Sequence, residues 1–142
     1  MTEIRNYKDL DAWRIGMETI DVTYRLTSGF PAGERFGLVS QMRRAAVSIP
    51  SNVAEGQAVR APRWSLRHIV IAIGSTAELD TQLEAAVRLG FVDESGSLPL
   101  RQVLERLQQL LYGLRRAKER RIAVTVSSAG VVILAALFRF FS

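Results

Sequence analysis

The chain contains four segments in which apolar residues recur every three or four positions, the repeat that places them on one face of an α-helix. The first segment covers residues 9–28 and ends before a Gly-Phe-Pro run, where proline cannot continue the helical hydrogen bonds. Its predicted buried stripe is Leu10, Trp13, Met17, Ile20 and Tyr24. The spacing therefore predicts a first helix of about five turns.

Three further segments repeat the pattern. The second, residues 34–59, carries Leu38, Met42, Ala45, Ile49 and Val53. The third runs from Pro62 to Gly90 and carries Leu66, Ile69, Ala72, Ile73, Thr76, Leu79 and Leu83. The fourth follows the polar turn 93–97 and carries Leu100, Val103, Leu104, Leu107, Leu110, Leu111 and Leu114. Four amphipathic helices with short connections predict an all-α fold, an up-down antiparallel four-helix bundle.

The C-terminal segment differs in kind, because residues 122–138 are seventeen consecutive positions without a charge. We divide the chain into a bundle, residues 1–121, and an apolar and helical tail, residues 122–142. If Arg139 reaches back to the lipid interface, the apolar stretch extends over residues 122–141 and matches the roughly 30 Å of a bilayer core. Packing on the bundle or inside an oligomer is the alternative, since two serines and a glycine dilute the hydrophobicity.

Length and composition limit the interpretation further. A chain of 142 residues is long enough for one domain with a real core and too short for two ordinary ones. The absence of cysteine excludes disulfides and thiolate metal sites. The formal charge of +5 is local, because residues 1–100 hold 11 basic and 12 acidic residues, whereas residues 101–121 hold 7 basic and 2 acidic ones.

The N-terminal sequence lacks the apolar core of a secretory signal, so we expect a cytoplasmic protein. The basic run that precedes the apolar tail matches the cytoplasmic flank of a membrane anchor, which would attach the bundle to the inner face of the membrane. The same run also suits a solvated helix end or a nucleic-acid patch.

No catalytic constellation is recognisable. His68 is the single histidine, so the paired Glu-x-x-His motifs of two-metal bundles are missing, and no Gly-rich phosphate loop is present. We expect no enzyme activity, no metal and no cofactor.

Basic side chains are the candidates for nucleic-acid binding, because guanidinium groups bind phosphate oxygens bidentately. They are Arg43, Arg44, Arg60, Arg63, Arg67, Arg115, Arg116, Lys118, Arg120 and Arg121. For Arg43 and Arg44 we favour ion pairs with Glu55, Glu78 or Glu84, within a subunit or between subunits, because the first hundred residues are not net basic.

Asn52 and Glu55 lie one helical turn apart, and with Glu78 and Gln82 of the third segment they could form a polar network. Such a network between helices or subunits would have a structural role, because buried polar groups can fix helix register and oligomeric state.

The run SQMRRAAVSIPSNVAEG, residues 40–56, resembles the signature of the bacterial four-helix-bundle family named for the ribosomal RNA intervening-sequence protein. The blocks YKDLDAW, residues 7–13, and GSTAELDTQL, residues 74–83, agree with it. The resemblance covers residues 7 to about 114. It implies a ring-like homo-oligomer, a pentamer, that binds RNA or a nucleic-acid-handling protein. An accessory protein of diversity-generating retroelements is similar in fold.

The leading prediction is a homo-oligomeric interaction module without enzyme activity, whose partner is RNA or a nucleic-acid-associated protein. The alternative is a structural or scaffolding bundle held at the membrane through residues 122–141.

Overall fold

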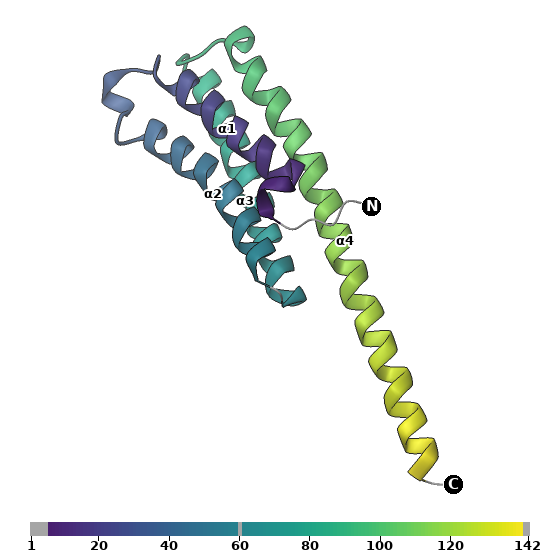
Figure 1. Ribbon diagram of the computed structural model, residues 1–142. Helices are drawn as coiled ribbons and strands as arrows, with labels where there is room; N and C mark the ends of the chain where they lie inside the picture. Colours follow the sequence, from purple (N-terminus) through teal and green to yellow (C-terminus); the bar gives the residue numbers. More distant parts are fainter. Residues whose placement is uncertain (1–5, 60, 141–142) are drawn as a thin grey trace.

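The structure, a computed structural model, describes residues 6–59 and 61–140, with side chains as far as residue 127. Its four α-helices are α1 (Asp11–Thr27), α2 (Leu38–Ala58), α3 (Pro62–Arg88) and α4 (Glu94–Phe140) (Figure 1). Short 3-10 helices precede α1 (η1, Tyr7–Asp9) and lie between α1 and α2 (η2, Ala32–Glu34). The described residues contain no β-strand.

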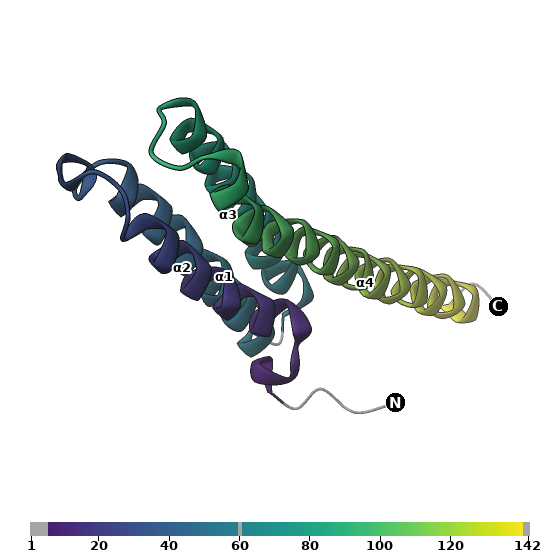
Figure 2. The ribbon, with the colours of Figure 1, turned by 90° about the horizontal axis from the view of Figure 1, so that it is seen from above.

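The helices form an antiparallel bundle. Both α1 and α3 pack against α2 and α4, and α2 and α4 lie diagonally opposite each other. Figure 2 shows the bundle from above, with α1 beside α2 and α3 beside α4. The all-α four-helix fold predicted from the sequence is therefore confirmed.

The predicted stripes of α2, α3 and α4 do form the core. Met42, Ile49 and Val53 of α2 are fully buried, and so are Leu79 and Leu83 of α3. From α4 the core takes Leu100, Leu104, Leu107 and Leu111. The three- and four-residue spacing identified these faces because each helix has one continuous apolar side.

The predicted stripe of α1 was wrong at Met17 and Tyr24, whereas Leu10 is buried and Trp13 and Ile20 pack against the core. Met17 and Tyr24 are 40% and 43% exposed, whereas the buried positions of α1 are Ala12, Ile15, Gly16, Thr19, Thr23 and Thr27. At about 100° per residue, Met17 and Tyr24 lie more than a quarter turn from the middle of the buried face. Apart from Ile15, the buried residues of α1 are small, which allows close packing against the neighbouring helices.

Three buried threonines of α1 satisfy their hydroxyl groups within the helix. Thr19, Thr23 and Thr27 each donate to the carbonyl oxygen four residues earlier, at 2.7–2.8 Å. Because a buried hydroxyl without a partner is costly, this bonding lets a polar row face the core.

Two glycines allow α2 to approach its neighbours. A Cβ at Gly56 would lie 3.0 Å from the Ser65 backbone oxygen and 3.1 Å from the His68 Cβ, both on α3. A Cβ at Gly16 of α1 would lie 3.1 Å from the Cβ of Pro50, which α2 contains in its interior. The signature run, residues 40–56, thus ends at a close contact between α2 and α3.

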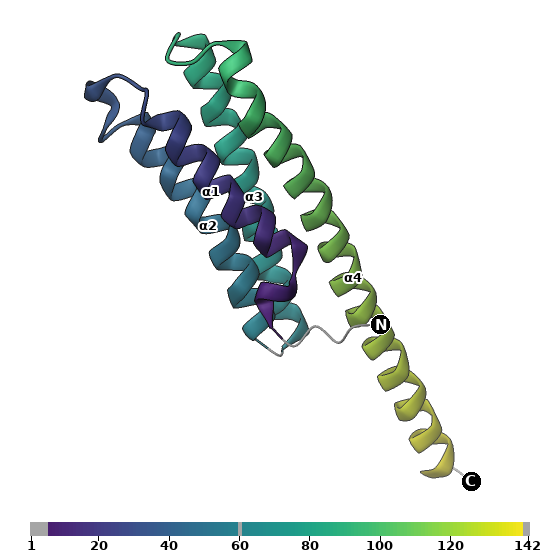
Figure 3. The same cartoon turned by 45° about the horizontal axis from the view of Figure 1, so that its top comes forward.

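α4 is one continuous helix of 47 residues that extends well beyond the ends of the other three (Figure 3). The boundary that we drew after residue 121 falls inside this helix. Over the part of the chain that the structure describes, no helix has an apolar run long enough to traverse a bilayer. Most of the predicted anchor, from residue 128 to residue 141, lies outside the residues whose side chains are described.

Candidate nucleic-acid interface

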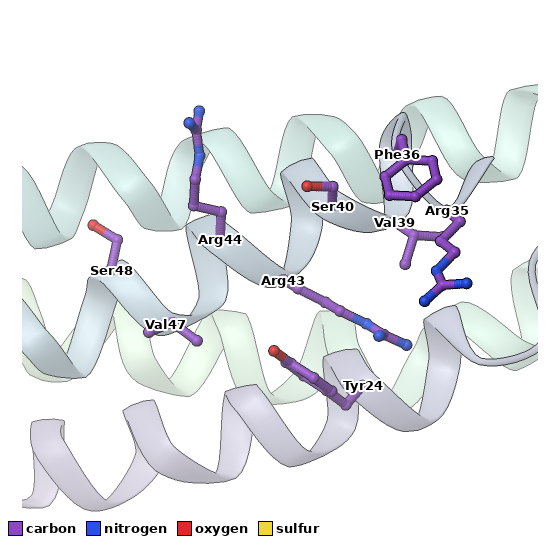
Figure 4. A pocket seen from close by; sticks show the side chains of 9 residues that line it. All are labelled: Tyr24, Arg35, Phe36, Val39, Ser40, Arg43, Arg44, Val47 and Ser48. Carbon is purple, nitrogen blue, oxygen red and sulfur yellow. The ribbon is translucent and has the colours of Figure 1, made fainter.

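A wide groove of about 660 Å³ runs over the outer side of α2 and reaches α1. We name it the α2 groove. Its lining is basic, aromatic and hydroxylic, and none of the nine residues is acidic: Tyr24, Arg35, Phe36, Val39, Ser40, Arg43, Arg44, Val47 and Ser48 (Figure 4). Most of them come from α2 and from the turn before it, so the start of this helix determines the groove.

Arg43 is held in place by α1. Its guanidinium carbon lies 4.4 Å from the centroid of the Tyr24 ring, and its Nε donates a hydrogen bond to the Thr27 Oγ1 at 3.0 Å. The Nε is thus occupied, while the terminal nitrogens extend along the groove toward Arg35 (Figure 4). A fixed guanidinium loses less entropy on binding an anion than a mobile one.

Arg35 and Phe36 stand at the opening of the groove before α2 begins. The Phe36 side chain is 89% exposed, and the Arg35 guanidinium carbon lies 5.5 Å from its ring centroid. The nearby carboxylate of Glu34 accepts a hydrogen bond from the Leu38 backbone nitrogen at 3.0 Å. Glu34 thereby caps the start of α2 and is not among the groove residues.

Arg44 is exposed on the opposite rim of the groove and points outward (Figure 4). Among the described residues it forms no ion pair. Neither Arg43 nor Arg44 contacts Glu55, Glu78 or Glu84 within the subunit, so the intramolecular ion pairs that we favoured from sequence are absent there.

A second basic cluster lies at the opposite end of the bundle, where α3 begins and α4 leaves the other helices. We name it the basic end, and it consists of Arg63, Trp64, Arg67, Arg115, Arg116, Lys118, Arg120 and Arg121. Trp64 is 55% exposed, and the Arg67 guanidinium carbon lies 5.2 Å from its ring centroid. Arg60 is not among the described residues.

Two members of the basic end have partners. The Nε of Arg115 donates to the Glu119 carboxylate at 2.8 Å, and this hydrogen bond raises the pKa of Arg115. The Lys118 ammonium donates to the Gln57 Oε1 at 3.4 Å, which ties α4 to the end of α2. Partial burial lowers the pKa of Lys118, and Arg121 lowers it further. Arg63, Arg116, Arg120 and Arg121 have no carboxylate partner within the described part of the chain.

The four residues of the predicted polar network do not bond to one another as one group within the subunit, and they lie in two separate groups. Asn52 Oδ1 and Glu55 Oε2 of α2 lie 3.1 and 3.3 Å from the Nδ1 of His68 on α3. Glu78 and Gln82 instead form a hydrogen bond of 3.1 Å along α3. His68 therefore joins α2 and α3, a role that no spacing pattern in the sequence indicated.

Sequence reasoning also missed Tyr24, Arg35 and Phe36. The available signal was the Arg-Phe pair at the start of the second segment, which belongs to none of the apolar stripes. Tyr24 could not have been found, because its spacing assigned it to the core. The described residues include no group of three or more His, Cys, Asp or Glu side chains that could hold a metal ion.

Residues 8–113 match the family described as 23S rRNA-intervening sequence protein. This match covers about three quarters of the chain, including α1, α2, α3 and the bundle part of α4. The chain belongs to the 23S rRNA-intervening sequence protein family. In this family member, the matched region contains the whole α2 groove and ends before the Arg115–Arg121 part of the basic end.

A solved structure supports the fold of this family member. It is a protein of unknown function from the S23 ribosomal protein family of Bacteroides thetaiotaomicron, with a TM-score of 0.67 and 15% sequence identity. The alignment covers 74% of this chain and 95% of that protein. The comparison with curated proteins gives no match. Neither the family description nor the description of the solved structure names a reaction.

Proposed function

We propose that this family member is an interaction module without enzyme activity and that its α2 groove binds single-stranded RNA. The observation that carries the proposal is the composition of the groove: three guanidinium groups, two aromatic rings and no carboxylate. Single-stranded RNA is recognised by aromatic side chains that stack on unpaired bases and by arginines that contact phosphate.

The shape of the groove also suits this ligand. Its volume of about 660 Å³ lies within the range of small-ligand sites, and it is open to the surface, so a segment of a strand could lie in it. Phe36, 89% exposed, offers a ring face to a base, while Arg43 is already oriented by Tyr24 and Thr27. The hydroxyl group of Ser40 adds a hydrogen-bonding group, whereas that of Ser48 is bonded to Ser75 and Asn52.

The family description names an intervening sequence of ribosomal RNA, which agrees with an RNA ligand. Self-association into a ring, a pentamer, is part of this proposal. Exposed apolar side chains outside the groove support it, namely Met17 on α1 and Val70 and Ile71 on α3.

The test is fluorescence anisotropy with a labelled oligouridylate over a series of salt concentrations. The Phe36→Ala variant should bind about tenfold or more weakly, because stacking of one base contributes about 1–3 kcal/mol. The Arg35→Ala/Arg44→Ala variant should reduce the slope of log K against log salt by about 1.4, since about 0.7 counterion is released per neutralised phosphate of a single strand.

The matched control is Arg25→Ala/Arg106→Ala, which removes two exposed arginines outside the groove. It should leave affinity and salt slope close to those of the unchanged protein. If this control weakens binding as much as the groove variant, or if the unchanged protein binds no oligouridylate, the groove is not an RNA site.

A further inference from the structure

The basic end has a different surface from the groove. Residues 61–67 and 112–121 hold seven basic side chains and a single acidic one, Glu119, which is paired with Arg115. Since Lys118 bonds to Gln57 near the start of α3, these two stretches lie at one end of the bundle. The result is a concentrated positive charge at the point where α4 leaves the other helices (Figure 1).

Apolar side chains lie exposed among and beyond these charges. Trp64 is 55% exposed with Arg67 beside it, and Val126, little more than one helical turn after Arg121, is 58% exposed. Bases offer little to an exposed valine, whereas the headgroup and acyl boundary of a lipid layer accommodates tryptophan and aliphatic side chains together with arginine.

We propose that the basic end docks the bundle onto an anionic lipid surface. Arg63, Arg67, Arg116, Arg120 and Arg121 would contact lipid phosphates, and Trp64 would enter the interface. The juxtaposition of these arginines, the exposed Trp64 and the uncharged sequence that follows Arg121 carries the proposal. Such docking needs no crossing of the bilayer.

The positive charge of the basic end also favours anionic lipid over neutral lipid. Each Lys or Arg close to an anionic leaflet adds about 1 kcal/mol, or about fivefold in affinity, and this attraction is absent for neutral lipid. Five arginines of the basic end have no carboxylate partner within the described residues, so their charge is available to lipid. The α2 groove lies at the other end of α2, and RNA and lipid would therefore occupy separate surfaces.

Co-sedimentation of the full chain with vesicles tests the proposal. Vesicles of phosphatidylglycerol in phosphatidylcholine should bind the protein, and pure phosphatidylcholine should bind it at least tenfold more weakly. The Arg120→Ala/Arg121→Ala variant should lose about tenfold or more in affinity for the anionic vesicles. In a Trp13→Phe background, the emission of Trp64 should shift to shorter wavelength when anionic vesicles are added.

The matched control is the groove variant Arg35→Ala/Arg44→Ala, which removes the same number of exposed arginines. It should bind anionic vesicles like the unchanged protein while losing RNA, and Arg120→Ala/Arg121→Ala should do the reverse. Equal binding to neutral and anionic vesicles would overturn the proposal, and so would a basic-end variant that loses RNA but keeps lipid. The two proposals can therefore fail independently.

Discussion

The two sides of α2 differ in almost every physical property. The inner side packs Met42, Ile49 and Val53 without exposure and has no space beside Gly56. The outer side presents Arg43, Arg44 and hydroxyl groups around an open groove. Both sides belong to the same run, residues 40–56, that resembles the family signature. A signature in one helix can thus combine residues that close the fold with residues that form a surface.

The largest loss of stability is expected for a substitution on the inner side of α2. Gly56→Val places a side chain against the Ser65 backbone oxygen, which lies 3.0 Å from the position of a Cβ. We expect a loss of about 3 kcal/mol in the free energy of unfolding, at the upper end for overpacking. Urea denaturation followed by circular dichroism measures it.

Gly113→Ala is the matched control, because a Cβ at Gly113 of α4 meets no heavy atom within 4 Å. It should raise stability by about 0.5–1 kcal/mol through helix propensity. A Gly56→Val protein as stable as the unchanged chain would mean that α2 and α3 can separate at no cost.

An intermediate loss of stability is expected for a substitution at Arg43, where the inner and outer sides of α2 meet. Arg43→Ala removes the hydrogen bond to Thr27 and the contact with Tyr24, so stability should fall by about 1–2 kcal/mol. Arg44→Ala should leave stability unchanged, because Arg44 is exposed on the groove rim. Thermal unfolding of both variants, together with their RNA affinities, separates the two roles of these adjacent residues. Equal stability of the two variants would show that the link to α1 contributes nothing.

The smallest change in stability is expected for a substitution at the contact between α3 and α4, away from both sides of α2. Hydrogen bonds from Arg101 and Arg88 lower the pKa of Glu84 below its ordinary value of 4.5. The carboxylate therefore contributes stability above pH 4.5, and the contribution is lost as pH falls through the folded-state pKa. Glu84→Gln should reduce stability slightly at neutral pH and not at all in strong acid. Unfolding curves across the acid range measure this, and a pH-independent difference would contradict it.

Most of the bundle could be predicted from the sequence, because three helices have one continuous apolar side. The buried side of α1 could not, since it is determined by the space beside Pro50 and by threonines that bond within the helix. Spacing alone favours the larger side chains, and these lie on the flank. Part of the α2 groove could also be predicted from the sequence. Arg43 and Arg44 were recognisable as candidates, but the position of Tyr24 depends on the rotation of α1 about its axis.

Because α4 is so long, its C-terminal part projects from the bundle as a single helix. Its last described contact with α2 is made by Lys118, and the helix continues for 22 residues to Phe140, roughly 33 Å at 1.5 Å per residue. Whatever holds its far end would fix both the distance and the direction of the α2 groove. One inserted residue would move the groove by about 1.5 Å and turn it by about 100° around the helix axis. The number of residues in α4 therefore determines the orientation of the α2 groove as well as its distance from the far end of the helix.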